Sequence, residues 1–467
     1  MVDAIVTTSA KKDAAAVLDR GSLRATLWLW AEVSVAGIGG PAMQIATMHR
    51  LFVQGKRWIS EERFISALSY CIALPGPETQ QLAIYIGWLA HRMIGGIIAG
   101  VLFIMPGVIC MMALCFGYVA GIDSQVDQTI FLGVRPAILA IMTQAILRFG
   151  SIVLPTRWLV AIAALAFVAA FFRFEFLIIL AVAALLGLCA ALAGLPGFSR
   201  AVPASIDNLA ATHIDDELPH HTRPSTTQFI RSLTIWLTLW LAPTIVLLAI
   251  LGPENIFTQI SLLYSKVAMM AVGGDYAVIA YAAQQDVGSY HWVTTREMQD
   301  GIAMGEMVPG TIMIVTQFLG FMAGYRHPGL LPPLLSGTFG GLLATWVTFA
   351  PCFLWIIVVA PFIESLRSNA FLNGPLRAVT AAAVGMIVNL TVWFGMHTLF
   401  HDLERIRYPW LKFDIPNVAT LDSWALVLFS AAAIAILRFK FNVALTLVAC
   451  SAVGMLLLFF GLTGVRS

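Results

Sequence analysis

Glycine and proline residues interrupt two apolar regions of this chain at four places, and interruptions of this kind can bind anions. They are Gly39-Gly40-Pro41, Pro75-Gly76-Pro77, Gly273-Gly274 and Pro309-Gly310. Because proline lacks a backbone donor and glycine leaves the backbone free to turn, each interruption is expected to end one helix and start another. The start of each new helix presents unpaired N–H groups that carry about half a positive charge, so the four ends could converge on one anion.

Polar side chains lie close in sequence to these interruptions. Gln44 and Gln81 are neutral hydrogen-bond donors, which suit a tetrahedral oxyanion, and Tyr276 closely follows the second glycine pair. Glu78 and Glu306 are ionisable, and an ionisable group at membrane depth is a functional candidate. Glu306 could therefore titrate during proton-coupled transport. The alternative is that it caps a helix or pairs with another group inside the bundle.

Three more charges lie near the same interruptions. Glu32 and Lys266 stand 234 positions apart and have opposite charges. We predict that they form an ion pair, which would lower the cost of both charges in a membrane. Asp275 adds a carboxylate directly after the second glycine pair.

The four interruptions belong to two copies of one pattern. Residue 40 corresponds to 274, Trp58 to Trp292 and Pro75 to Pro309, each at an offset of 234 positions. A period of this length indicates an internal duplication. In a membrane protein, duplication is typical of transporters that hold the substrate between two repeats. The alternative is that the glycines only allow close helix packing, but four interruptions at duplicated positions favour a binding site.

The composition places these repeats in a membrane. Hydrophobic residues make up 59% of the 467 residues and charged residues 11%, against about 45–50% and about 25% in globular proteins. Residues 93–122, 176–199 and 329–363 contain no Asp, Glu, Lys or Arg, and about 20 apolar residues cross a bilayer. We predict an all-α, polytopic membrane protein with about 12–13 membrane segments and broken helices. Nothing in the sequence indicates a nucleic-acid partner, a cofactor or a metal site.

The chain divides into five predicted parts. Residues 1–24 are a cytoplasmic tail, 25–196 the first repeat, 197–231 a polar linker, 232–254 an extra span and 255–467 the second repeat. If the first repeat holds six membrane segments, one unmatched span before the second repeat turns that repeat upside down relative to the first. Inverted repeats are therefore expected.

Four blocks of sequence resemble the chromate transporter family, in its long two-domain form. They are GGPAMQIATMHRLF, RWISEERFISALSYCIALPGPETQQLAIYIGWLAHR, GGDYAVIAYAAQQ and WVTFAPCFLWIIVVAPFIESLR. The resemblance implies chromate efflux at the bacterial inner membrane, with chromate as a sulfate-like dianion and the proton gradient as energy source. The chain departs from the family pattern at Glu32, where lysine is usual, and at Asp275, where a small residue is usual.

These observations predict a secondary active transporter of a tetrahedral oxyanion, rather than an enzyme. Chromate is the expected substrate and sulfate the alternative. A passive anion channel is the rival from another class, but it needs a continuous polar lining and polar residues are sparse here. The lipid bilayer and a second copy of the chain, in a homodimer, are the other expected partners.

Overall fold

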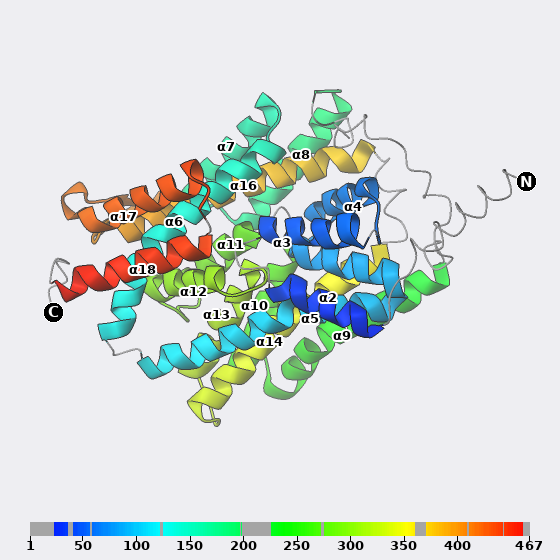
Figure 1. Ribbon diagram of the computed structural model, residues 1–467, viewed down its shortest axis with the longest axis horizontal. Coiled ribbons are helices and arrows are strands. Elements are labelled where there is room, and N and C mark those ends of the chain that lie inside the picture. Colours follow the sequence, from blue (N-terminus) through cyan, green and yellow to red (C-terminus); the bar gives the residue numbers. More distant parts are fainter. Residues whose placement is uncertain are drawn as a thin grey trace, which may run out of the picture.

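The computed structural model describes residues 23–35, 41–56, 58–121, 125–196, 198, 226–271, 275–359, 370–408, 411–441 and 443–460, which form a helical bundle (Figure 1). The helices of the first repeat are α2 (Leu23–Val35), α3 (Pro41–Met48), the π-helix η1 (His49–Gly55), α4 (Glu61–Ala73), α5 (Glu78–Gly121), α6 (Gln125–Val153), α7 (Arg157–Phe171) and α8 (Phe176–Leu192). Helix α9 (Thr226–Leu251) follows the linker and contains most of the predicted extra span.

The second repeat begins with short helices and ends with long ones. They are α10 (Ile256–Met269), α11 (Asp275–Gly288), α12 (Thr295–Met307), the 3-10 helix η3 (Ile312–Ile314), α13 (Val315–Arg326), α14 (Pro333–Val359), α16 (Ala370–Leu399), α17 (Ser423–Ala433), the π-helix η6 (Ile434–Arg438) and α18 (Val443–Phe459). The all-α class and the broken helices predicted from sequence are confirmed.

The helices have the length and surface of membrane spans. In the described part of the chain, four helices are long and apolar enough to cross a bilayer, and they lie within α5, α9, α14 and α16. Large apolar side chains such as Leu177, Ile178 and Leu185 of α8 are exposed, which is unfavourable in water and favourable against lipid. The protein is therefore a multi-pass membrane protein.

In the second repeat, four short helices form two hairpins that turn back inside the bundle. Arg326, at the end of α13, forms an ion pair with Glu297 at the start of α12, and Gly301 packs on Phe318 further along the pair. Helices α12 and α13 are therefore antiparallel, with their turn at residues 308–311. Helices α10 and α11 form the other hairpin, in which Tyr264 Oη donates to Asp286 Oδ2 at 3.0 Å.

The first repeat has the same two hairpins. Trp30 of α2 contacts Phe52 of η1, with ring centroids 4.7 Å apart. Trp58 precedes α4 and lies 6.3 Å from the ring of His91, where non-helical dihedral angles at His91 and Arg92 divide α5 into a short and a long part. Helix α4 and the short part of α5 therefore form the second hairpin, with its turn at residues 74–77.

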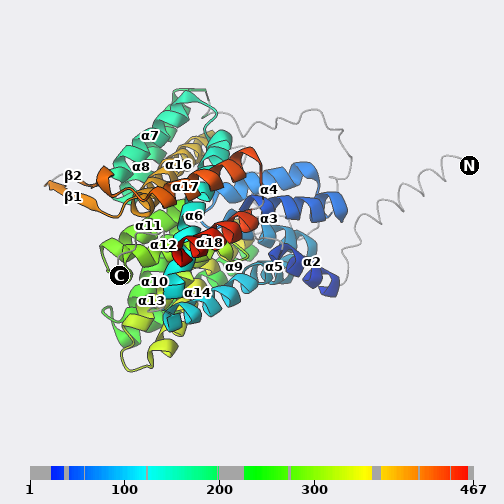
Figure 2. The ribbon, with the colours of Figure 1, turned by 60° about the vertical axis from the view of Figure 1, so that its left-hand side comes forward.

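The two sets of hairpins open at opposite ends of the bundle. The long part of α5 starts at His91, beside the open ends of the first set, and near its other end Phe116 contacts Phe321 of α13, one turn from the open end of the second set. We call the end with Trp58 and His91 the first face, and the end with Trp292 and Arg326 the second face. In Figure 2, α2–α4 lie at the right and α10–α13 at the left. The repeats are inverted, as the single unmatched helix α9 predicts.

After the hairpins, the long helices of each repeat alternate in direction and pack on the other repeat. Helix α6 packs on α17 and α18, and α16 packs on α7 and α8. These contacts are equivalent, because α6 and α16 occupy the same place in their repeats. Neither repeat could bury these surfaces alone, so the two halves fold as one body.

Glycine contacts bring the same two helices together in each repeat. A Cβ on Gly87, in the short part of α5, would collide with the backbone of Gly95 in the long part. In the second repeat, a Cβ on Gly320 of α13 would lie 2.7 Å from the carbonyl oxygen of Gly340 in α14. The backbones approach so closely that only glycine fits.

Prolines inside the long helices leave carbonyl groups that other helices satisfy. Pro351 frees the carbonyl of Val347 in α14, which accepts a hydrogen bond from Trp240 Nε1 of α9 at 3.1 Å. Pro243 frees the carbonyl of Leu239 in α9, which accepts one from Trp346 Nε1 of α14, also at 3.1 Å. Because an unpaired carbonyl is costly in lipid, the two helices depend on each other.

The sequence did not predict the one sheet in the described chain. Strands β1 (Leu403–Tyr408) and β2 (Leu411–Pro416) form an antiparallel hairpin at the second face (Figure 2). It joins α16 to α17, and Phe400 and Leu421 pair at its base. We call it the β-hairpin.

Candidate functional site

Described residues at or beside the hairpin turns lie inside the bundle and bond across the repeats. The amide of Gly76, in the first repeat, donates to the carbonyl of Ala271 at the end of α10, at 2.9 Å. Gln44 Nε2, on α3, donates to the carbonyl of Gly310 in the second repeat, at 2.5 Å. Each repeat thus contributes one hydrogen bond to a turn of the other. The described turns at 74–77 and 308–311 each bond to the other repeat, and helices begin beside the four interruptions at Pro41, Glu78, Asp275 and Ile312.

The two proline–glycine turns have the same backbone conformation. Gly76 has φ 120° and Gly310 has φ 114°, which L side chains rarely adopt. In the first turn, Gln81 Nε2 closes the loop by donating to the carbonyl of Pro75 at 2.6 Å. In the second, Thr311 Oγ1 accepts from the amide of Met313 at 3.2 Å. The turns therefore present a fixed backbone shape to each other.

Buried acceptor and donor atoms surround the turns. Thr79, Gln80 and Gln81 begin the helix after the first turn and have no exposed surface. The amide oxygens of Gln80, Gln81 and Gln317 have no hydrogen-bond partner among the described residues. Since buried polar atoms are normally paired, these side chains are available for rearrangement or for a ligand.

Two carboxyl groups are buried beside the turns. Glu306 lies directly before the second turn and accepts a hydrogen bond from Tyr276 Oη, on the neighbouring hairpin. Glu78 is the first residue of α5, where the positive end of the helix favours a carboxylate. Glu306 and Glu78 are 6% and 8% exposed, so both are shielded from solvent. The structure thus brings Glu306 and Tyr276 together, which the sequence analysis had treated as separate candidates.

The predicted ion pair between Glu32 and Lys266 is wrong for this structure. Both residues are exposed, and the ion pairs of the described residues do not include one between them. Lys266 Nζ lies instead over the ring of Tyr281, 5.8 Å from its centroid. The reason is geometric: equivalent positions in inverted repeats are related by a two-fold axis, so they meet only if they lie on it.

Some predicted site residues lie outside the part of the chain that can be compared. Gly39, Gly40, Gly273 and Gly274 lie outside the described residues, and the side chains of Pro41 and Asp275 are not described. Pro75, Pro77 and Pro309 flank the two turns described above.

The sequence analysis missed a buried charge cluster between the repeats. Asp300 of α12 accepts hydrogen bonds from Arg135 of α6, at 2.6 and 3.0 Å to Oδ1, and from Tyr118 Oη of α5, at 3.0 Å to Oδ2. The Asp300 and Arg135 side chains are 4% and 17% exposed. Arg135 lies within an apolar helix, and this was the sequence signal that could have revealed the cluster, because a charge at membrane depth needs a partner.

The architecture defines the class of this protein. Inverted repeats, hairpins that turn back within the bundle, and helix ends that meet at one place together describe a multi-pass membrane transporter. A family profile described as "Chromate transporter" matches residues 24–188 and 258–455, one region in each repeat. The chain belongs to the chromate transporter family.

Relatives with a similar sequence support this assignment. The chain is 29% identical over 357 residues to a chromate transport protein of Pseudomonas aeruginosa, covering 76% of each chain. It is 24% identical over 405 residues to a probable chromate transport protein of Synechococcus elongatus, covering 87% of this chain and 91% of the relative. A chromate transport protein of Cupriavidus metallidurans is 24% identical over 381 residues, covering 79% and 82%. No solved structure matches the chain.

Proposed function

We propose that this protein is a secondary active transporter that moves chromate out of the cell and so confers chromate resistance. The observation that carries the proposal is the meeting of the duplicated turns, where Gly76 and Gln44 each bond to the other repeat. A site between inverted repeats can be opened to either side of the membrane by moving one repeat against the other. The chromate transport proteins named above support chromate as the substrate.

The anion would be bound by helix starts and neutral donors. The helices that begin at Pro41, Glu78, Asp275 and Ile312 direct their positive ends toward the turns. Gln44 and Gln81 now donate to backbone carbonyls, and these donors would turn to the anion when it enters. The glycine pairs Gly39-Gly40 and Gly273-Gly274 would complete the site from the other two hairpins.

Glu306 is the proposed coupling group. In an exchange of outgoing chromate for incoming protons, Glu306 would carry the proton after the anion has left the turns. Tyr276 Oη holds the carboxyl at the turn. Glu78 and Asp275 are the other acids at the helix starts, and Glu32 and Lys266 lie further out, at exposed positions.

The charges at the two faces give the proposed orientation. Basic residues of the described chain at or near the first face are Arg24, Arg50, Lys56, Arg63, Arg92, Arg148, Arg157, Arg231, Arg377, Arg438 and Lys440. Those at or near the second face are Arg173, Arg296, Arg326, Arg405, Arg407 and Lys412. The excess at the first face puts that face in the cytoplasm of a bacterial inner membrane. A dianion leaving a cell with a negative interior then moves in the direction that the membrane potential favours.

Sulfate transport and a passive anion channel are the alternatives. Sulfate has the same shape and charge as chromate, so helix starts and amides would bind both. The test uses purified protein in sealed vesicles, with labelled chromate and sulfate, and with an imposed proton gradient or membrane potential. Saturable flux of chromate that responds to the proton gradient supports the proposal. Flux that neither saturates nor depends on the proton gradient overturns it in favour of a channel, and preference for sulfate overturns the substrate.

A further inference from the structure

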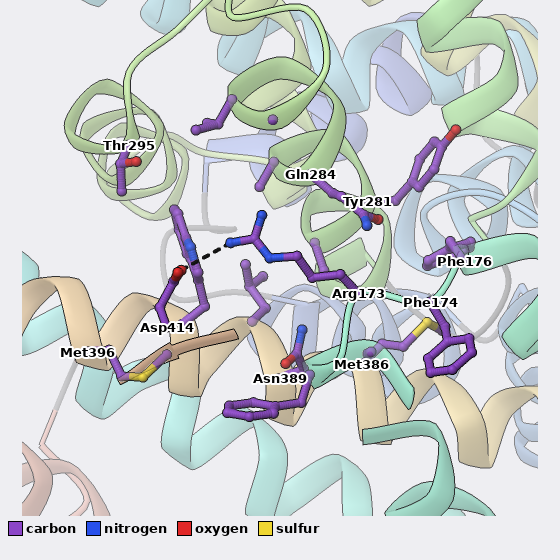
Figure 3. A pocket seen from close by; sticks show the side chains of 18 of the residues that line it. Arg173, Phe174, Phe176, Tyr281, Gln284, Thr295, Met386, Asn389, Met396 and Asp414 are labelled. Atoms are coloured by element: carbon purple, nitrogen blue, oxygen red, sulfur yellow. Dashed lines mark hydrogen bonds and ion pairs between the residues drawn. The ribbon is translucent and has the colours of Figure 1, made fainter. Parts of the chain in front are cut away.

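A cavity of about 470 Å³ opens at the second face, away from the hairpin turns. Its walls are α11, α16, the connection between α7 and α8, and strand β2 (Figure 3). The cavity reaches from Asp414 on the β-hairpin to Met386, which lies about 20 Å along α16 from the end of that helix. It is therefore a deep, water-accessible recess that leads into the bundle.

A single arginine crosses this cavity. Arg173 Nη2 lies 3.0 Å from Asp414 Oδ2, and the arginine side chain is 45% exposed while the aspartate is 11% exposed. Figure 3 shows the guanidinium reaching across the open space to the carboxylate. Asp414 is the only acid among the residues that line the cavity.

The other polar groups of the cavity suit an anion. Gln284, Asn389 and Thr295 can donate hydrogen bonds, and the imidazole rings of His291 and His397 also line the cavity. Arg173 and His291 also have positive φ angles, 61° and 55°. Residues held in this conformation cluster at active sites and ligand clamps.

The inner end of the cavity leads toward the hairpin turns. Tyr281 lines the cavity from α11, and Lys266 of α10 holds its ammonium group 5.8 Å from the centroid of that ring. These two helices are joined by the connection that contains the second glycine pair. The ring of Tyr281 therefore adjoins both the cavity and the ammonium group of Lys266.

We propose that this cavity is a vestibule that binds the tetrahedral oxyanion through Arg173, with Asp414 as an internal competitor for the same guanidinium. The proposal rests on the proposed transport function and adds a second, outer site to it. An oxyanion accepts two hydrogen bonds from a guanidinium in the same way as a carboxylate. The anion must therefore displace Asp414, which weakens binding at the second face and favours release there.

The test measures labelled chromate and sulfate uptake in vesicles of both orientations, so that each face is exposed in turn. With the second face outward, Asp414→Asn is expected to lower the half-saturating concentration about five-fold, because a partly buried ion pair no longer competes. Arg173→Gln is expected to raise it about five-fold or more. With the first face outward, both variants should shift the half-saturating concentration less, because the anion then binds first at the hairpin turns.

Asp402→Asn is the matched control, because it removes an exposed acid at the same face outside the cavity. Asp402→Asn should leave the half-saturating concentration unchanged with either face outward. Asp414→Ser repeats the test if Asp414→Asn folds poorly, and it must shift the half-saturating concentration in the same direction. If Arg173 only anchored the β-hairpin, both exchanges would act in the same direction, and that result or no change overturns the vestibule. A wild type that transports neither anion overturns the proposed function instead.

Discussion

The two proline–glycine turns share a backbone but differ in what surrounds them. Beside the first turn, Gln80 bonds to a backbone carbonyl in the long part of α5 and Gln81 to the carbonyl of Pro75 in the turn itself. Beside the second, Glu306 bonds to Tyr276 of the neighbouring hairpin, and Asp300 bonds to α6 of the other repeat. Buried side chains beside the first turn thus bond through neutral amides, whereas those of α12 beside the second bond through carboxylates.

This difference indicates that the two repeats took on different roles after duplication, which we call the division of labour. The backbone of the turns was kept in both copies, since both need a glycine with positive φ. The ionisable side chains at depth are concentrated in α11 and α12 of the second repeat, at Asp286, Asp300 and Glu306. We therefore expect the first repeat to shape the site and the second to respond to charge.

The largest expected effect follows from the acid that ties the second repeat to the first. Asp300→Ala leaves the guanidinium of Arg135 buried without a carboxylate, which costs about 3–5 kcal/mol. Thermal denaturation of the purified protein in detergent should show this loss. The double variant Arg135→Met with Asp300→Leu should lose less, since it leaves no unpaired charge.

The control for this variant is Glu61→Ala at the first face. Its partner is His49, at 2.7 Å, and the glutamate side chain is 44% exposed. An exposed pair contributes about 1 kcal/mol or less. Equal losses for Asp300→Ala and Glu61→Ala would show that the buried cluster does not join the repeats.

The next effect compares the two glycines directly. Gly76→Ala and Gly310→Ala both force an L residue to φ near 120°, which costs about 1–3 kcal/mol. A Cβ at residue 76 would also lie 2.7 Å from Gln81 Nε2 and 2.9 Å from Cys352 Sγ, whereas at residue 310 the nearest atom is 3.9 Å away. Gly76→Ala should therefore unfold at a lower temperature than Gly310→Ala.

Overpacking accounts for the expected gap, at about 1–3 kcal/mol. Replacing Cys352, which the new Cβ would contact, by a smaller residue tests whether overpacking causes the gap. Combining Gly76→Ala with Cys352→Ala should recover part of the loss, and the same exchange added to Gly310→Ala should recover none. Equal stability of the two single variants would argue that the turns are equally packed.

The acids beside the two turns, Glu306 and Glu78, are expected to differ in their part in the response to the proton gradient. Glu306→Gln is expected to reduce the proton-gradient-dependent rate about ten-fold, equivalent to about 1.4 kcal/mol, because the glutamine cannot take up a proton. Glu78→Gln should retain most of the gradient response, since its carboxyl sits at a helix start. Chromate flux at a series of imposed pH gradients measures both.

Folding must be excluded as the cause of a lower rate. Both glutamine variants should elute as a single species of wild-type size, and flux driven by membrane potential alone should persist in Glu306→Gln. If the two variants respond alike to the pH gradient, the division of labour between the turns is wrong.

The smallest effect concerns the helices around the turns. Trp240→Phe leaves the carbonyl of Val347 without its donor and should cost about 1 kcal/mol of stability. Pro351→Ala supplies a backbone amide that can bond to the same carbonyl within α14. In the Pro351→Ala background, Trp240→Phe should therefore have a smaller effect. An undiminished loss in that background would mean that tryptophan acts through packing.

Local chemistry explains what the sequence could predict. Ser60 accepts from the amide of Arg63 as an N-cap residue, and Thr294 with Glu297 forms the expected capping box. The four helix starts also fall where glycine and proline predicted them. Each of these features depends on residues within about five positions, so one stretch of sequence contains the whole signal.

The partners of the buried charges could not be predicted in the same way. Arg135 and Asp300 are 165 positions apart, and the sequence around one residue does not indicate that the other is its partner. The predicted pair of Glu32 and Lys266 failed because a shared place in two repeats does not imply contact. The β-hairpin was missed because a single short pair of strands leaves little trace in a helical pattern.

The exchange of tryptophans between α9 and α14 limits how the molecule can move. If one of these helices slid along the other, two carbonyl groups would lose their hydrogen-bond donors within the hydrocarbon. Helices α9 and α14 must therefore move together as one rigid unit, which we call the strut. The contact between the two repeats at the hairpin turns, which we call the seam, includes single hydrogen bonds from Gly76 and from Gln44 among the described residues. A working cycle would open and close along that seam, with the strut as its fixed frame.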